Sequence, residues 1–211
     1  MAYEEIDYEP SELPLTGKVR ALVDAAEKRF EAFYAQKLNK RYPRYIASEP
    51  AQVYAALRWV SERGLTPGEK FIEWGSGFGI ATGMAALLDY EATGIELREG
   101  LVDIARELMA GQSIDAEFIC TSYIPEGYLE YDIAGGSDIV PDDSFGHQLE
   151  AGPVYQDVYH EIDIAEVDLF YVYPWPGEQE MMLKLFDAVA GVDAILIAYF
   201  GDREICIYRK L

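Results

Sequence analysis

The sequence predicts an α/β protein with a Rossmann-like, mostly parallel sheet, helices on both faces and an N-terminal helical cap. From residue 70 onwards, apolar stretches of strand length alternate with stretches whose apolar residues recur every three or four positions, and this alternation is typical of parallel β-α units. A glycine-rich run also follows the first of these strands directly. The length of 211 residues leaves room for one such domain and a small addition. We expect residues 1–66 to form an acidic leader and the cap, and residues 67–211 to form the core.

Two helices are expected in the cap. Apolar residues recur at three- and four-residue steps between Gly17 and Leu38, which is the pattern of an amphipathic helix. A second helix is expected to begin where Ser48 can cap it and Pro50 fits its first turn. This helix is expected to end at Gly64.

The core is expected to alternate strands and helices. The expected strands are Phe71–Trp74, Thr93–Leu97, Ala116–Cys120, Val167–Tyr173, Ala194–Phe200 and Glu204–Tyr208, and the expected helices are Ile80–Leu88, Leu101–Leu108 and Glu178–Val189. Only a tight turn at Gly201 and Asp202 separates the last two strands, so the last strand is expected to run antiparallel at an edge of the sheet. Residues 121–166 form an insert rich in Gly, Pro, Asp and Tyr. An insert of this length is a lid, a binding loop or partly disordered.

The formal net charge is −21, and its distribution along the chain is uneven. Residues 16–70 carry 11 Lys and Arg against 6 Asp and Glu, whereas residues 107–183 carry 17 Asp and Glu and no Lys or Arg. Because this charge repels phosphates over most of the surface, nucleic acid is not expected as a partner. Tyrosines among the carboxylates of the insert favour a cationic partner instead, since aromatic faces and acids attract ammonium groups.

The N-terminal stretch MAYEEIDYEPSELP has neither the basic segment nor the apolar segment of a signal peptide. No run of about 18 apolar residues occurs that would span a membrane. The two cysteines lie in apolar stretches and are expected to be buried thiols in a reducing compartment. We therefore expect a cytoplasmic protein without a membrane partner.

Three glycines alternate along the run after the first core strand: Gly75, Gly77 and Gly79. Because they lack Cβ atoms, they let backbone N–H groups approach a ligand and let the next helix begin without clashes. Glu73 lies two residues before the run, and Glu96 lies at the end of the next strand, where an acidic side chain accepts hydrogen bonds from ribose hydroxyls. The pattern predicts a nucleotide-containing cofactor at the carboxyl ends of these two strands.

Two cofactor classes compete for this glycine run. The dinucleotide pattern G-x-G-x-x-G needs its third glycine five residues after the first, but Ile80 occupies that position. Glu73 would repel a pyrophosphate and would attract an ammonium or a sulfonium. The segments Phe-Ile-Glu-Trp-Gly-Ser-Gly-Phe-Gly and Thr-Gly-Ile-Glu-Leu resemble motifs I and II of the class I S-adenosylmethionine-dependent methyltransferases. This resemblance covers residues 70–200.

The resemblance implies a seven-strand Rossmann-like methyltransferase with S-adenosyl-L-methionine as its cofactor. The cofactor-binding residues that it implies are Gly75, Gly77 and Gly79 along the methionine and ribose, Glu73 near the amino end, Glu96 at the ribose and Ser122 at the adenine. The reaction would be a direct SN2 transfer of the methyl group to a nucleophile.

The same resemblance places the methyl acceptor after the fourth core strand, at Tyr173-Pro174-Trp175. Aromatic and proline side chains form a rigid wall that can hold an acceptor in line for transfer. Tyr173 and Trp175 are the expected catalytic residues, and Tyr173 is the candidate that takes a proton from an amine. Methylases of nucleobase amino groups have Asp or Asn at the place of Tyr173, and tRNA guanine-N7 methylases have basic residues where Gly177 and Glu178 follow here.

The chain has a helix, the glycine run, an aromatic segment and a later helix in this order. This layout looks like that of the small Dot1-like lysine methyltransferases and of those that act on ATP synthase subunits. The chain departs from them in the insert over residues 121–166, in the lack of a hydrophobic anchor and in its short C-terminus. This likeness implies a protein lysine as the methyl acceptor, with a small amine or another small molecule as the second choice.

Two functions from other classes stay open. One is a binding-only protein that retains the cofactor pocket, with the acidic insert as a docking surface. The other is an NAD-dependent oxidoreductase, against which Glu73 and Ile80 argue. No metal site is expected, because the carboxylates around His160 match no known spacing of metal ligands.

Overall fold

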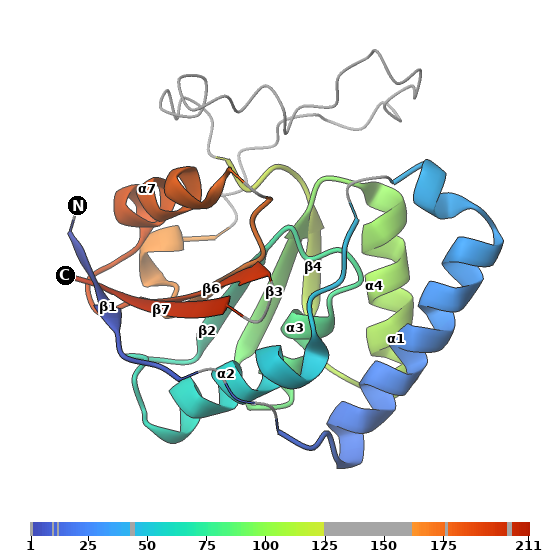
Figure 1. Cartoon of the computed structure of the whole chain (residues 1–211), viewed down its shortest axis with the longest axis horizontal. Helices are drawn as coiled ribbons and strands as arrows, with labels where there is room; N and C mark the ends of the chain where they lie inside the picture. The colour runs from blue at the N-terminus through green and yellow to red at the C-terminus, as the bar shows by residue number, and fades with distance from the viewer. Residues whose placement is uncertain are drawn as a thin grey trace.

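The computed structural model describes residues 2–9, 11, 13–42, 45–124, 162–175, 177–201 and 204–211. This part of the chain contains a seven-stranded sheet in the order β1-β7-β6-β5-β2-β3-β4 (Figure 1). The strands are β1 (Tyr3–Ile6), β2 (Lys70–Trp74), β3 (Glu91–Glu96), β4 (Glu117–Cys120), β5 (Leu169–Val172), β6 (Ile195–Gly201) and β7 (Glu204–Lys210). The helices are α1 (Gly17–Ala35), α2 (Pro50–Glu62), α3 (Ile80–Ala86), α4 (Glu99–Gln112) and α7 (Gln179–Val189), with the short 3-10 helices η1 (Leu38–Lys40) and η4 (Ile164–Glu166).

The strands from β2 to β6 form a parallel sheet, as the alternating pattern predicted. β2 pairs in parallel with β3 and β5, β3 pairs with β4, and β5 pairs with β6. β7 runs antiparallel to β6, which confirms the direction expected from the tight turn. The predicted fold class is therefore confirmed.

The acidic leader supplies β1, a strand that the sequence analysis did not anticipate. It pairs antiparallel with β7, from Tyr3 opposite Lys210 to Ile6 opposite Ile207. The edge position expected for the last strand is therefore wrong, because β1 lies outside β7 and is the antiparallel edge strand. The backbone N–H of Leu211 donates to the carbonyl of Ala2 at 2.7 Å and closes this end of the pair. A four-residue strand with two central glutamates has no clear alternation of apolar and polar residues. Its pairing with β7 therefore left no signal that local sequence patterns could detect.

α1 and α2 form where the apolar periodicity predicted them. α1 ends at Ala35, earlier than expected, because Lys37 adopts a left-handed conformation with φ of 60° and the chain then winds into η1. Pro50 begins α2 as predicted, but Ser48 does not cap this helix, because the cap position falls on Glu49 and no side chain bonds the helix end. None of the helices within the described ranges is long and apolar enough to span a membrane.

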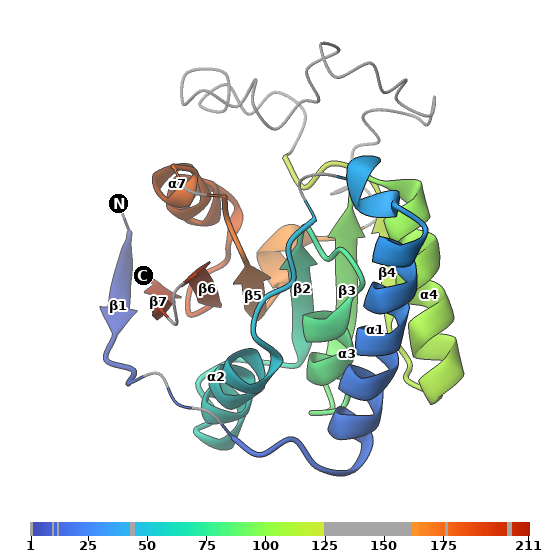
Figure 2. The same ribbon diagram turned by 45° about the vertical axis from the view of Figure 1, so that its right-hand side comes forward.

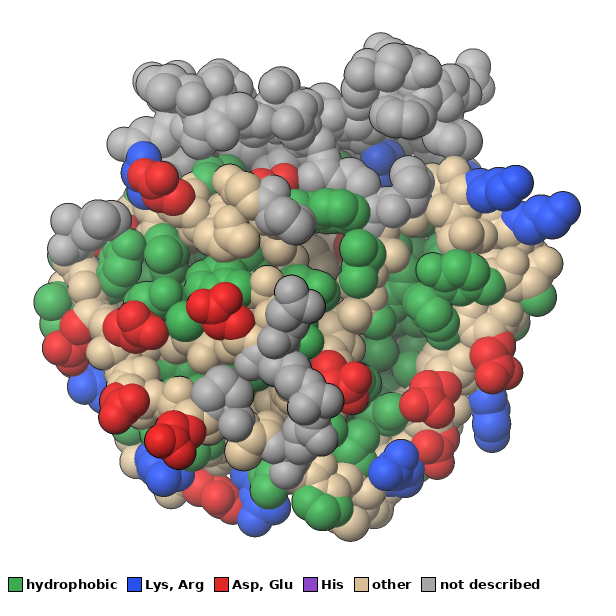
Figure 3. All heavy atoms as spheres, in the orientation of Figure 1, with side chains coloured by type: hydrophobic (Ala, Val, Ile, Leu, Met, Phe, Trp, Pro, Cys, Tyr) green, Lys and Arg blue, Asp and Glu red, His purple; other side chains and the backbone are tan. Residues whose placement is uncertain are grey.

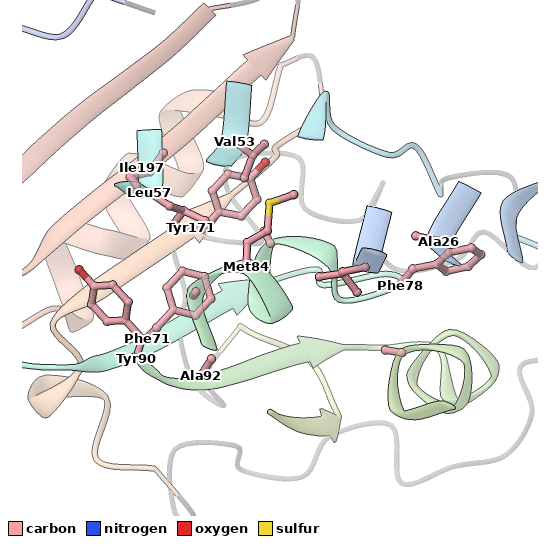
Figure 4. Close-up of a cluster of buried hydrophobic side chains, with 14 of the residues drawn as sticks. Ala26, Val53, Leu57, Phe71, Phe78, Met84, Tyr90, Ala92, Tyr171 and Ile197 are labelled. Carbon is pink, nitrogen blue, oxygen red and sulfur yellow. The ribbon is translucent and has the colours of Figure 1, made fainter. Parts of the chain in front are cut away.

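Helices cover both faces of the sheet (Figure 2). On one face, α1, α2, α3 and α4 enclose a buried core, in which Tyr171 and Ile197 of the sheet lie beside Leu57 of α2 (Figure 4). On the other face, Phe186 of α7 packs against Phe170 of β5, with ring centroids 5.4 Å apart. The two cores fix the central strands from both sides, so the ends of these strands are held rigidly.

The sheet reverses its strand order between β2 and β5. After β2 the chain builds outwards through β3 and β4 on one side, and β5 and β6 lie on the other side. Open parallel sheets bind ligands at such a point, beyond the carboxyl ends of the strands. Figure 3 shows the molecule in the orientation of Figure 1, with hydrophobic side chains at the surface among acidic and basic ones.

Most of the insert expected over residues 121–166 lies outside the described residues. The structure describes Thr121 to Ile124 directly after β4 and describes the chain again from Ile162, which leads into η4. His160, its neighbouring carboxylates except Asp163 and most of the insert's tyrosines fall in the part between. The role of this insert therefore stays a prediction.

Candidate functional site

The glycine run forms a tight loop between β2 and α3. The backbone N–H groups of Gly75 and Ser76 both donate to the carbonyl of Ile95 in β3, at 2.9 and 2.8 Å. Gly75, Gly77 and Gly79 have φ of 74°, 54° and 71°, a region that costs residues with a Cβ about 1–2 kcal/mol each. Positions 75, 77 and 79 thus need glycine for the backbone to turn. The loop has no side chain at these three positions beyond the carboxyl end of β2.

Glu96 ties this loop to the end of β3. Its Oε2 accepts from the backbone N–H of Gly77 at 3.0 Å, and its Oε1 accepts from the backbone N–H of Arg98 at 2.9 Å. Burial raises the pKa of Glu96, while the two backbone hydrogen bonds and the Arg98 charge lower it. Each oxygen has a second lone pair, so the carboxylate has capacity to accept hydrogen bonds from a ligand hydroxyl.

Glu73 is buried, with 6% of its surface exposed, below the same loop. Its Oε2 accepts from the backbone N–H of Thr82 at 2.8 Å and from the Thr82 hydroxyl at 2.5 Å. Its Oε1 has no hydrogen-bond partner among the described residues. Burial raises the pKa of Glu73 to about 8, against the lowering effect of the Thr82 bonds, and the charge of Glu96 raises it as well. One oxygen of Glu73 therefore has a structural role, and the other is available to a donor.

Thr82 is a site residue that the sequence analysis missed. It lies in the first turn of α3, where backbone N–H groups have no partner within the helix, and it is fully buried. A hydroxyl residue in the first turn after a glycine loop is a signal that could have been used. Its contact with Glu73 nevertheless joins residues nine positions apart, which no local periodicity indicates.

These residues fit the adenosyl and methionine parts of S-adenosylmethionine. The Tyr45 ring packs on Gly77, where a Cβ would collide with it, whereas a Cβ on Gly75 would meet only the Tyr123 ring at 3.9 Å. Two acceptor groups flank the loop, namely the free Oε1 of Glu73 and the carboxylate of Glu96. Acceptors of this kind suit an ammonium group and ribose hydroxyls, and they do not suit phosphates.

Tyr173 and Trp175 lie just beyond the carboxyl end of β5, the strand next to β2. Val172 of β5 pairs with Trp74 of β2, so Tyr173 is level with Gly75. Both aromatic side chains are partly buried. The backbone N–H of Trp175 donates to Glu178 at 3.3 Å, which holds the turn into α7. The catalytic roles of these two residues stay predictions.

Two further tyrosines, which the sequence analysis did not select, lie on the same face as Tyr173. The ring of Tyr199 in β6 packs edge-on against Tyr173, with centroids 4.8 Å apart and an interplanar angle of 90°. Tyr171 is 1% exposed, and its hydroxyl lies near Ser48. Burial raises the pKa of Tyr171 well above its ordinary value, and the nearby Ser48 lowers it. The charges of Glu73, Tyr199 and Tyr173 raise this pKa further. The Tyr171 hydroxyl from β5 thus lies within electrostatic reach of Glu73.

Ser122 follows β4 at the same edge of the sheet. Its hydroxyl accepts from the backbone N–H of Ile124 at 3.1 Å, so this side chain stabilises the local turn. A contact between Ser122 and an adenine stays a prediction. Within the described ranges, His, Cys, Asp and Glu residues form no group of three that could bind a metal ion, and the carboxylate of Asp163 accepts instead from Ala165 in the first turn of η4.

Comparison of the structure with solved structures identifies the fold. A methyltransferase from Geobacter sulfurreducens superposes with a TM-score of 0.53 and 12% sequence identity, over 94% of this chain and 93% of the other. The chain shares this methyltransferase fold. An RNA methyltransferase from Salinibacter ruber, solved with S-adenosyl-L-homocysteine, matches with a TM-score of 0.48 and 15% identity, over 79% of this chain and 92% of the other.

Comparisons at the level of sequence do not assign the chain to a protein family. No protein-family model matches the chain, and no curated protein shows significant similarity to it. The likeness to methyltransferases that the two motifs suggested is thus confirmed at the level of the fold. The narrower likeness to Dot1-like and ATP-synthase-directed lysine methyltransferases finds no support in these comparisons.

Proposed function

We propose that the chain is an S-adenosylmethionine-dependent methyltransferase. The observation that carries this proposal is the glycine loop between two carboxylates, the buried Glu73 and the partly buried Glu96, at the point where the strand order reverses. This is the place where open α/β sheets bind their ligands. The shared fold with a solved methyltransferase supports the same conclusion.

The chain's own residues would bind the cofactor at both ends of the glycine loop. When bound, S-adenosylmethionine supplies a methyl group on a positively charged sulfonium. Glu73 would accept a hydrogen bond from the amino group through its free Oε1, and Glu96 would accept from the ribose hydroxyls. Gly75 and Gly77 would let the backbone approach the ligand between these two carboxylates. The buried surroundings strengthen both interactions, because the local dielectric constant is low.

An NAD-dependent oxidoreductase is the weaker alternative. Glu73 is buried below the loop that would hold a pyrophosphate, and phosphate charges there would disfavour its ionisation, whereas an ammonium group would favour it. Ile80 begins α3, in the position where the dinucleotide pattern needs a glycine. Neither feature suits a dinucleotide.

For the acceptor we propose an amine, either a protein lysine or a small molecule, bound beside β5 and β6. The cofactor residues lie at β2 and β3, so the adjoining strand ends on the other side of β2 are left for the acceptor. Tyr173 and Tyr199 form an aromatic pair there, and aromatic faces attract ammonium groups by roughly 0.5–2 kcal/mol each. Tyr173 would take the proton that the amine must lose, and Trp175 would form part of the wall that holds the acceptor in line.

Binding measurements with two matched variants test the cofactor site. Glu96→Gln is expected to weaken S-adenosylmethionine binding about tenfold or more, because a hydrogen bond to a charged group contributes roughly 1.5–3 kcal/mol. Glu91→Gln changes an exposed carboxylate at the opposite end of the same strand and is expected to bind as the wild type does. Equal affinity in both variants would contradict the proposed role of Glu96.

Transfer of tritium from methyl-labelled S-adenosylmethionine tests the acceptor. We expect label to enter poly-L-lysine or n-butylamine and not total tRNA. Label in tRNA would reject the amine and keep the methyltransferase. Tight cofactor binding without label in any of the three probes would favour the binding-only alternative.

A further inference from the structure

Tyr45 covers the glycine loop from the segment that connects the two cap helices. A Cβ placed on Gly77 would collide with the Tyr45 ring, so this ring lies directly on the Gly77 backbone. The same ring stacks on Phe78, with centroids 4.4 Å apart and an interplanar angle of 23°. One face of the ring is thus covered by Phe78, and the ring itself lies at the loop that the proposed function assigns to the cofactor.

Other aromatic rings hold Tyr45 in this position. Phe30 and Phe33 of α1 pack edge-on against it, at centroid distances of 6.1 and 5.8 Å. Phe33 and Phe78 are themselves buried in the core on this face of the sheet. A ring with three aromatic neighbours has little freedom to leave, which makes Tyr45 a fixed wall of the site and not a movable gate.

Gly77, on which the Tyr45 ring lies, also donates its backbone N–H to Glu96. Burial raises the pKa of the Tyr45 hydroxyl, and the charges of Glu73 and Glu96 raise it further, against the effect of the nearby Phe78 backbone amide. The ring therefore lies at the part of the loop that Glu96 holds. In S-adenosylmethionine the sulfur atom joins the amino-acid chain to the ribose. A ring at this loop is consequently a candidate for contact with the sulfur.

We propose that Tyr45 is a cofactor-binding residue whose ring contacts the sulfonium and makes the site prefer cationic S-adenosylmethionine over neutral S-adenosylhomocysteine. This inference rests on the proposed function, because it assigns a further residue to the same site. Its physical basis is the attraction between a cation and the face of an aromatic ring, which strengthens when both are shielded from water. Because the product S-adenosylhomocysteine would bind more weakly, it would be replaced readily by a new molecule of S-adenosylmethionine.

Calorimetric titration of wild type and Tyr45 variants with both ligands tests the proposal. Tyr45→Leu is expected to lower the affinity for S-adenosylmethionine about tenfold and that for S-adenosylhomocysteine less than about threefold. Tyr45→Phe keeps the ring and is expected to keep the wild-type ratio of the two affinities. Tyr90→Leu is the control, because Tyr90 packs near Phe71 and Thr66, at the end of β3 remote from the loop.

The ratio of the two affinities separates contact with the sulfonium from a purely structural role. If Tyr45→Leu weakens both ligands equally, or weakens neither, the proposal is overturned. If this variant does not fold, pentafluorophenylalanine introduced at position 45 keeps the shape of the ring and reverses its quadrupole, and the same loss of preference is expected. A wild-type chain that binds neither ligand would reject the proposed function itself, and a binding wild type with unchanged ratios in the variants would reject only the role of Tyr45.

Discussion

Glu96 accepts a hydrogen bond from the backbone N–H of Gly77 at 3.0 Å, so the end of β3 holds the loop that follows β2. The other oxygen of Glu96 accepts from Arg98 at the start of α4. One carboxylate thereby connects two strand ends and a helix. Side chains of this site stabilise the fold and would also bind the ligand, so each variant needs separate measurements of stability and of binding.

Gly77→Ala is expected to destabilise the fold more than Gly64→Ala. Both glycines have positive φ, 54° and 58°, so both substitutions cost about 1–2 kcal/mol of backbone strain. A Cβ at position 64 meets open space, whereas a Cβ at position 77 collides with the Tyr45 ring, which adds roughly 1–3 kcal/mol. Urea unfolding of the two variants measures the difference. Equal losses would show that the ring does not lie on the loop.

Thr82→Val is expected to lower the free energy of unfolding by about 1–3 kcal/mol, because Glu73 loses a hydrogen bond inside the core. Thr82→Ser retains the hydroxyl and is expected to lose less. Thermal unfolding at constant pH compares the two variants. A serine variant as unstable as the valine variant would indicate that packing, not the bond to Glu73, accounts for the loss.

The stability of the wild type is expected to fall as the pH rises through the range in which Glu73 titrates. Burial raises the pKa of Glu73 to about 8, whereas an unfolded glutamate titrates near about 4.3. The folded chain therefore binds more protons between these values, and the free energy of unfolding decreases with rising pH. Glu73→Gln removes this contribution and is expected to show a flatter dependence in urea unfolding between about pH 5 and pH 8. If the free energy of unfolding depends on pH equally in the wild type and in Glu73→Gln, titration of Glu73 does not cause the decrease.

Cofactor binding is expected to release a proton near neutral pH. A neutral Glu73 carboxyl would ionise when an ammonium group binds to it, because an opposite charge lowers the pKa of a carboxyl group. Tris takes up protons with a larger release of heat than phosphate does. The binding enthalpy at pH 7 is therefore expected to be more negative in Tris than in phosphate, and Glu73→Gln is expected to abolish the difference. The same enthalpy in both buffers for the wild type would count against ionisation of Glu73.

Much of the fold and of the glycine loop could be predicted from the sequence. Alternating apolar periods gave the parallel strands and their helices, and the spacing of Gly75 to Gly79 gave the turn that the positive φ values require. Glu73 and Glu96 could be selected because each lies at a fixed distance from a strand end. Features of this kind are local, and local patterns are what a single sequence contains.

Contacts between distant segments could not be predicted in the same way. β1 depends on pairing with a strand about 200 residues later, Thr82 acts through Glu73, and Tyr199 reaches Tyr173 only once β5 and β6 are neighbours. The position of Tyr45 between the two cap helices suggests a place near the rim of the cofactor site, but its contact with Gly77 depends on the packing of α1 on the core. In each case the partner is set by the three-dimensional arrangement of elements, which periodicity does not specify.

Calorimetric titration of the wild-type chain with S-adenosylmethionine, S-adenosylhomocysteine and NAD tests whether the glycine loop with Glu73 and Glu96 binds S-adenosylmethionine. We expect saturable binding of the first two ligands, with dissociation constants in the range of about 1–100 μM, and no binding of NAD. Binding of NAD alone would overturn the proposed cofactor, as would the absence of binding by all three ligands.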